Sequence, residues 1–288
     1  MDSFILQTLN GISYSALLFL LASGFTLTFG LMRVVNMAHG AYYLVGGYVG
    51  LMIAKLTGSL VAALIAGGCA GMLIGFISDQ MLIRRAGSDH LAQVLITVGI
   101  AYIIGDLSLK TWGGDAQKLP LPMDLRGVIE FPGGIVYPIF RVLLTTIGVA
   151  VAGLLWLLYK RTFVGAAIRA GVDNREMVSA TGINIDRLFI LVSALAAFLA
   201  GFSGVLGGAF LTVYPGAEWE ILVFALVVVI VGGLGSLEGA MVGALVVGLL
   251  DAYGRWLVPE LSYFVLFGPM AILLLFRPRG LFGSENMT

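Results

Sequence analysis

Two ionisable side chains stand directly before Gly-Ala pairs in otherwise apolar sequence. His39 precedes Gly40 and Ala41, and Glu238 precedes Gly239 and Ala240. Ionisable groups inside a membrane segment are the groups that carry protons in ion-coupled carriers. They also have a structural use, because a buried polar side chain can hold the backbone of an interrupted helix. We favour the structural use, and the candidate residues of a helix break or translocation path are Asn36, His39, Gly40, Gly235, Glu238 and Gly239.

The two motifs have similar surroundings in the two halves of the chain. Gly46 and Gly50 follow the first motif, and Gly243 and Gly248 follow the second. Paired interrupted segments in two halves indicate a central pathway in transporters. Chance similarity between glycine-rich membrane segments is the competing explanation, and the sequence leaves both open.

A polar loop, residues 160–187, separates two uncharged runs. Residues 164–170 predict a short helix that Gly171 ends, and Asp173 with Glu176 resembles a capping box that starts a second helix before Gly182. Small side chains on a short helix let another backbone approach closely, as on a docking surface. A solvated linker with helical character is the alternative, and the spacing alone leaves both open. The candidate docking residues are Gly165, Ala166, Ala167, Arg169, Ala170, Asn174 and Gly182.

The sequence lacks the motifs that would make it an enzyme. It has no G-x-x-x-x-G-K-[ST] loop for ATP and no G-x-S-x-G elbow. His39 and His90 are its only histidines, so no H-E-x-x-H or His-Cys metal motif occurs. We therefore expect neither a metal site nor a cofactor in this chain.

The composition is that of a membrane protein. Hydrophobic residues make up 59% of the chain and charged residues 11%, and 40 of its 288 residues are glycine. Such glycine-rich apolar sequence is typical of tightly packed transmembrane helices. The formal net charge of zero gives no basic surface for nucleic acid, and the single cysteine excludes an intrachain disulfide. The sequence predicts one all-α, polytopic membrane domain over residues 1–288.

Uncharged runs predict eight or nine transmembrane segments, since about 20 residues cross the hydrocarbon core. One or two are expected to be broken or re-entrant, namely 34–54 and part of 221–250. The nine predicted segments are residues 3–32, 34–54, 56–78, 91–109, 142–159, 188–213, 221–231, 240–250 and 261–276.

Basic residues set the expected orientation. Arg84 and Arg85, the loop 160–187 and the C-terminal arginines are placed on the cytoplasmic side by the positive-inside rule, with the N-terminus outside. The loop 110–138 is then extracytoplasmic, and its Pro-Gly-Gly sequence predicts a hairpin over 126–136. Glu218 and Glu220 are expected near the outer surface, and Asp251 is expected to pair with Arg255 four residues later.

Four motifs in order resemble the branched-chain amino acid ABC transporter permease family. The loop 160–187 is similar to a cytoplasmic coupling loop, and the other three motifs lie at Asn36 to Gly40, Gly232 to Gly239 and Arg277 to Phe282. The matching residues in and after the loop are Gly165, Arg169, Ala170, Asn174, Ala180, Gly182, Ile183, Asn184, Ala200 and Gly201.

The resemblance implies a permease subunit of a bacterial inner-membrane importer that forms half of a translocation path. It implies a second, related permease, two ATPase subunits that use the ATP, and an extracytoplasmic solute-binding protein. It leaves the substrate open, because related permeases serve branched-chain amino acids, urea, short amides or aromatic acids.

Two other transport classes compete with this interpretation. An ion-coupled carrier needs ionisable groups deep in the bilayer, whereas Asp106, Glu238 and Asp251 fall at predicted segment ends. A channel also tolerates broken helices, but it leaves the structured loop 160–187 unexplained.

Overall fold

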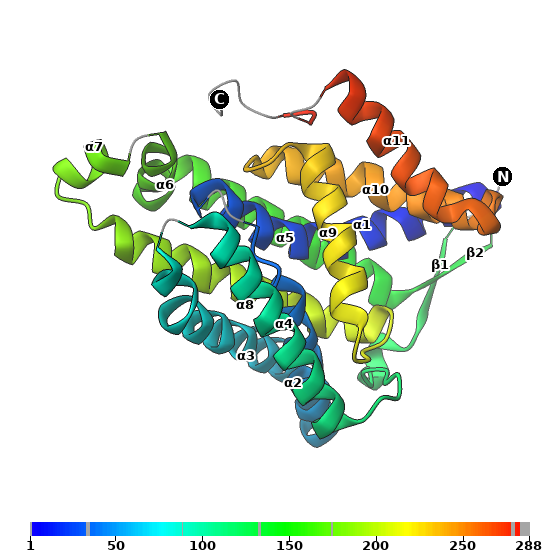
Figure 1. Cartoon of the computed structure of the whole chain (residues 1–288). Helices are drawn as coiled ribbons and strands as arrows, with labels where there is room; N and C mark the ends of the chain where they lie inside the picture. Colours follow the sequence, from blue (N-terminus) through cyan, green and yellow to red (C-terminus); the bar gives the residue numbers. More distant parts are fainter. Residues whose placement is uncertain are drawn as a thin grey trace.

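The protein is a bundle of helices in a computed structural model (Figure 1) that describes residues 2–32, 35–87, 89–131, 134–173, 175–277 and 280–282. The longer helices are α1 (Asp2–Met32), α2 (His39–Thr57), α3 (Leu60–Met81), α4 (His90–Trp112), α5 (Ile139–Arg161), α8 (Ile185–Phe210), α9 (Ala217–Gly232), α10 (Leu237–Leu257) and α11 (Ser262–Phe276). The shorter elements are η1 (Ile83–Ala86), η2 (Met123–Leu125), β1 (Val128–Phe131), β2 (Ile135–Pro138), α6 (Phe163–Asp173), α7 (Arg175–Ala180) and η3 (Pro259–Leu261).

Among the described residues, six helices are long and apolar enough to cross a membrane: α1, α3 with η1, α4, α5, α8 and α10. Helices α2, α9 and α11 also lie at predicted segments but are not among these six. Helices α9 and α11 have only 16 and 15 residues, whereas α2 has 19. The all-α polytopic fold is thus confirmed. The number of eight or nine crossings remains a prediction.

Glycine explains how α2, α3 and α8 pack so closely at the centre. A Cβ atom on Gly46 of α2 would lie 2.3 Å from the Gly201 carbonyl oxygen of α8. A Cβ atom on Gly201 would lie 2.3 Å from the Gly67 carbonyl oxygen of α3. The three backbones touch at this crossing. Such contact is expected in a membrane, where van der Waals packing drives helix association and small residues let the backbones approach closely.

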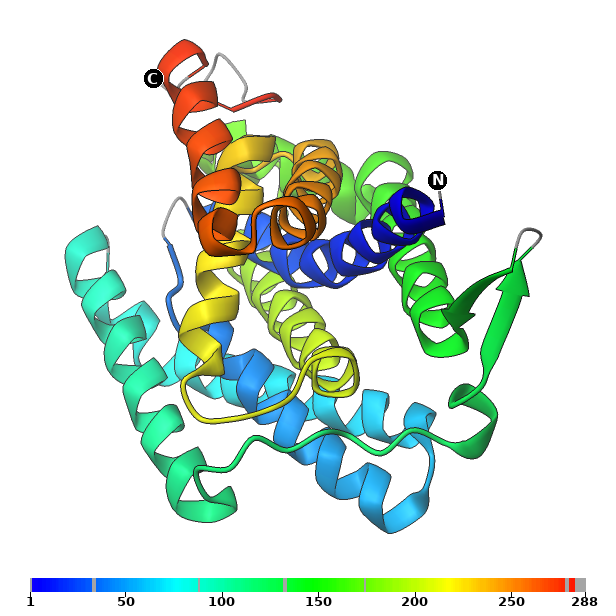
Figure 2. The same cartoon turned by 90° about the vertical axis from the view of Figure 1, so that its right-hand side faces the viewer.

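The predicted hairpin is confirmed. Strands β1 and β2 pair antiparallel, with Phe131 opposite Ile135. The preceding chain runs across the end of α8 (Figure 2), where the Leu119 N–H donates to the Gly208 carbonyl oxygen at 3.0 Å. Gln117 and Val213 exchange two backbone hydrogen bonds of 2.8 Å, so this connection is anchored to the bundle.

The loop 160–187 contains two helices, as predicted, but the first is longer than expected. Helix α6 continues through Gly171 to Asp173, because a glycine within a helix costs only about 1 kcal/mol relative to alanine and does not by itself end it. Helix α7 is followed by Gly182, whose φ of 86° lies in the left-handed region. Asn174 and the side chains of the expected capping box lie outside the described residues.

Candidate functional site

Both Gly-Ala motifs contact α9, one at each end of the helix. A Cβ atom on Gly40 would lie 2.2 Å from the Glu218 carbonyl oxygen in the first turn of α9. A Cβ atom on Gly239 would lie 2.3 Å from the Gly232 carbonyl oxygen at its last residue. Helix α9 crosses α1 steeply instead of running beside it (Figure 1). The two motifs therefore fix the position of one central helix.

Glu218, at the start of α9, is expected near the outer surface of the membrane, and this placement stays a prediction. Its side chain is buried, with 4% exposure, and its Oε2 accepts the Gly216 N–H at 2.7 Å. After α8, Val213 pairs with Gln117 before the chain turns into α9. Glu220 is exposed, and its Oε2 accepts the Tyr214 hydroxyl at 2.6 Å.

The turn between α1 and α2 is held by the first motif. The Asn36 side-chain oxygen accepts the Ala38 N–H at 3.0 Å, and the Thr97 hydroxyl of α4 accepts the Met37 N–H at 3.2 Å. His39 is buried, and its Nε2 lies 3.1 Å from the Leu21 carbonyl oxygen of α1. These contacts give Asn36 and His39 a structural use at this turn.

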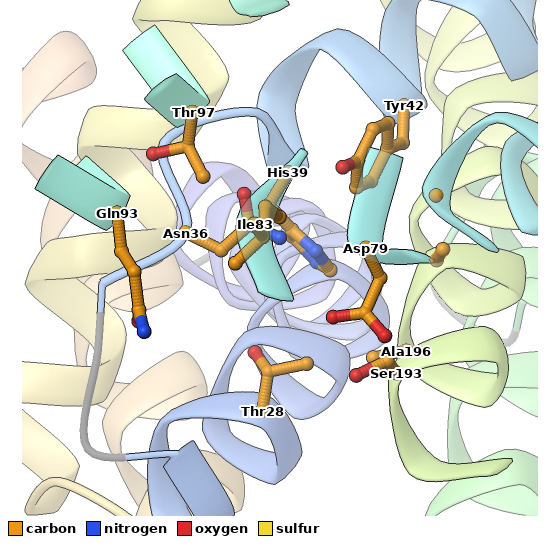
Figure 3. A pocket seen from close by; sticks show the side chains of 12 residues that line it. Thr28, Asn36, His39, Tyr42, Asp79, Ile83, Gln93, Thr97, Ser193 and Ala196 are labelled. Carbon is orange, nitrogen blue, oxygen red and sulfur yellow. The ribbon is translucent and has the colours of Figure 1, made fainter. Parts of the chain in front are cut away.

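The same turn lines a small cavity between α1, α2, α3, α4 and α8 (Figure 3). Its volume of about 20 Å³ has room for one water molecule and excludes an amino acid. The buried Asp79 carboxylate in its wall accepts Arg84 Nε at 3.0 Å. The lining residues are Thr28, Asn36, His39, Tyr42, Gly75, Asp79, Ile83, Gln93, Thr97, Ser193, Ala196 and Ala197.

Sequence reasoning missed Asp79 and Tyr42. Asp79 stands five residues before Arg84, at the end of an uncharged run, and that spacing was the one available signal. The cavity has no volume for a transported solute.

Helix α6 turns one face to the protein and one to solvent. Gly165, Ala167 and Ile168 are buried, and a Cβ atom on Gly165 would lie 2.2 Å from the Tyr159 carbonyl oxygen of α5. The expectation that Gly165 and Ala167 present a docking surface therefore needs correction, because their small size serves packing inside this chain.

The opposite face of α6 is exposed and apolar. It carries Phe163, which is 74% exposed, together with Ala166 and Ala170. Arg169 lies between the two faces and donates a hydrogen bond from its guanidinium to the Tyr159 carbonyl oxygen. The guanidinium carbon also lies 5.1 Å from the centre of the Tyr159 ring. Of the predicted docking residues, Ala166, Ala170 and Gly182 are exposed, while Arg169 mainly fixes α6 to the end of α5.

The second motif forms the turn between α9 and α10. Gly235 has a φ of 79°, and the Ser236 side chain caps α10 by accepting the Gly239 N–H at 3.0 Å. Glu238, in the first turn of α10, forms an ion pair of 2.8 Å with Lys160 at the end of α5. The structure thus brings the turn motif and the base of the loop 160–187 together.

The other two acidic residues considered for an ion-coupled carrier, Asp251 and Asp106, are not arranged as an ion pathway. Asp251 pairs with Arg255 at 2.8 Å, as predicted, and Asp106 is exposed. No group of three or more His, Cys, Asp or Glu side chains that suits a metal ion occurs in the part of the chain that the structure describes.

Comparisons with known proteins agree over nearly the whole chain. Residues 7–274 match the family described as the permease component of a branched-chain amino acid transport system. The chain is 28% identical to the high-affinity branched-chain amino acid transport system permease protein LivH of Escherichia coli (strain K12), over 99% of this chain and 97% of the relative. It is 26% identical to the corresponding permease protein BraD of Pseudomonas aeruginosa, over 98% of this chain and 96% of the relative.

A solved structure supports the fold independently of these sequences. PsaBC from Streptococcus pneumoniae in complex with Fab aligns with a TM-score of 0.50, covering 93% of this chain and 89% of that chain. At 12% identity, the likeness concerns the fold alone.

Proposed function

Because this chain belongs to the family of branched-chain amino acid transport permease components, we propose that it is the transmembrane permease subunit of an ATP-binding cassette importer and forms half of a translocation path. The observation that carries the proposal is the match over residues 7–274, which includes the whole loop 160–187. An exposed apolar face on α6, outside the apolar helices, is the kind of surface that a partner protein covers.

The partners follow from the proposed role. We infer a second, related permease, two ATPase subunits that bind and hydrolyse the ATP, and an extracytoplasmic solute-binding protein. The ATPases would contact the face of α6 that carries Phe163, Ala166 and Ala170. Substrate would cross between the two permeases, and this chain would contribute α9 and its two turns to the moving parts.

Branched-chain amino acids are the proposed substrates, because the two curated relatives above are named for their transport. Neither relative's name supports urea, short amides or aromatic acids. Copurification of the importer components, followed by identification of the ligand on the solute-binding protein, tests this assignment. A binding protein that retains only urea or an amide would overturn the substrate, and the absence of any copurifying ATPase would overturn the importer.

We further propose an inner-membrane location with an outside N-terminus and a cytoplasmic C-terminus, reached through nine crossings. The N-terminal end of α1 and the β-hairpin lie at the opposite end of the molecule from α6 and α7 (Figure 1), which supports placing them on opposite sides of the membrane.

Cysteine labelling tests the orientation in intact cells. With the exposed Cys69 replaced by serine, cysteines at Ala170 and at position 284 should resist a membrane-impermeant maleimide, while a cysteine at Glu130 of β1 should react. Permeabilised cells, in which all three positions should react, are the control. Labelling at position 170 before permeabilisation would reverse the proposed orientation.

A substitution at His39 separates the importer from a proton-coupled carrier. His39→Gln should keep most ATP-driven uptake, because the glutamine amide can still donate a hydrogen bond to the Leu21 carbonyl oxygen. His39→Leu should lower the stability of the permease by about 0.5–1.5 kcal/mol through loss of that hydrogen bond. Uptake by reconstituted complexes with and without a proton gradient, together with thermal unfolding, provides the measurement. Uptake driven by the gradient without ATP would contradict the importer.

A further inference from the structure

The corner between α5 and α6 is built as one rigid unit. Gly165 packs directly against the carbonyl oxygens of Leu158 and Tyr159, and the Thr162 hydroxyl accepts the Gly165 N–H at 3.1 Å. Arg169 binds the Tyr159 carbonyl oxygen from the other side of the corner. Lys160 lies within this unit, so any displacement of α6 also displaces Lys160.

The turn between α9 and α10 is a second rigid unit. A Cβ atom on Gly232 would lie 2.2 Å from the Gly239 carbonyl oxygen, and one on Gly243 would lie 2.4 Å from the Val228 carbonyl oxygen. Backbones in such contact cannot slide past each other without breaking their packing. The end of α9 and the start of α10 therefore move together.

The C-terminal segment closes this second unit. The Leu281 N–H donates to the Val231 carbonyl oxygen and the Phe282 N–H to the Gly232 carbonyl oxygen, both at 2.9 Å. These bonds satisfy carbonyl groups that a helix leaves without intrahelical partners in its last turn. Residues 280–282, the end of the last of the four sequence motifs, are thus hydrogen-bonded to the end of α9 beside the α9–α10 turn.

One ion pair joins the two units among the described residues. Lys160 Nζ lies 2.8 Å from Glu238 Oε1, and the two side chains are 43% and 36% exposed. An ion pair with this much exposure is weak and exchanges readily with water. It adds little to the stability of the fold, but it can form in one state of the protein and break in another.

We propose that the Lys160–Glu238 ion pair transmits movement between the α5–α6 corner and the α9–α10 turn during transport, and that it forms in only one of the two access states. Lys160 and Glu238 are then positioning residues for the transport cycle. The inference rests on the proposed importer function. A contact made in one state alone biases the equilibrium between states by its own free energy, so a weak pair is sufficient.

Charge reversal and charge exchange test the pair. Glu238→Lys and Lys160→Glu should each lower the substrate transported per ATP hydrolysed by up to about fivefold, the largest change that one exposed pair can supply. The double variant, which exchanges the charges, should recover most of the loss. Glu238→Gln should be mild, because its amide oxygen still accepts a hydrogen bond from Lys160. Arg161→Glu, the same charge change at the exposed neighbouring position, is the control and should leave this ratio unchanged.

Cross-linking tests the state dependence directly. In a Cys69→Ser background, cysteines at 160 and 238 should be joined by a short bismaleimide to different extents in the nucleotide-free and the vanadate-trapped complex. Equal yields in the two states would overturn the proposal, as would a charge exchange that fails to restore the ratio in a stable complex. If the wild-type complex shows no ATP-driven uptake at all, the importer function itself fails, so the two failures are distinguishable.

Discussion

Replacing Gly201 by leucine should prevent the chain from accumulating as a folded membrane protein. Even a single Cβ atom at this position would lie 2.3 Å from the Gly67 carbonyl oxygen and 3.1 Å from the Gly71 Cα atom. Both neighbours are backbone, so no side-chain rotation makes room. Overpacking costs about 1–3 kcal/mol where neighbours can shift. Here α2, α3 and α8 would have to separate, and the loss should exceed that range.

Gly99→Leu is the matched control, because no atom lies within 4 Å of a Cβ atom built at Gly99 in α4. It should keep or raise stability, since leucine is the better helix former by up to about 1 kcal/mol. Expression level and size-exclusion profile of tagged protein in detergent compare the two. A monodisperse, well-expressed Gly201→Leu protein would show that this three-helix crossing is not as close as described.

Features with local causes were predictable from the sequence. The Pro-Gly-Gly turn between two β-rich runs predicted the hairpin, and each uncharged run predicted a helix at the right place. The excess of glycine predicted close helix packing. It did not say which glycines meet, because the contact of Gly46 with Gly201 depends on how α2 and α8 cross.

Features set by tertiary structure were not predictable. Glu218 follows a Pro-Gly turn, and the sequence did not indicate that its side chain would be buried, because that depends on how α9 packs in the bundle. The sequence predicted a short helix in the loop 160–187, and α6 lies there, whereas its docking role stays a prediction. Only the orientation of α6 on α5 decides that Gly165 points inward. Lys160 and Glu238 are far apart in the sequence, so neither residue indicates the other.

Tryptophan on the exposed face of α6 should uncouple the complex without damaging the permease. Ala166 and Ala170 lie on this face with Phe163 and are exposed, whereas Gly165 is buried against the Tyr159 carbonyl oxygen. If an ATPase subunit covers the face, Ala166→Trp overpacks that interface at a cost of roughly 1–3 kcal/mol. That cost weakens association by roughly fivefold to 150-fold, since each 1.4 kcal/mol is a factor of ten.

The position of the tryptophan separates docking from folding. Gly165→Trp should destabilise the permease itself, because it forces α6 away from α5. Ala166→Trp should leave its unfolding temperature unchanged while ATPase retention and substrate-stimulated hydrolysis fall. Ala86→Trp, on the partly exposed turn η1 of another loop, should leave the unfolding temperature, the ATPase retention and the substrate-stimulated hydrolysis unchanged. If Ala166→Trp retains both the ATPase and its stimulation, the loop 160–187 is a solvated linker, and the coupling contact must be sought on another surface of the permease.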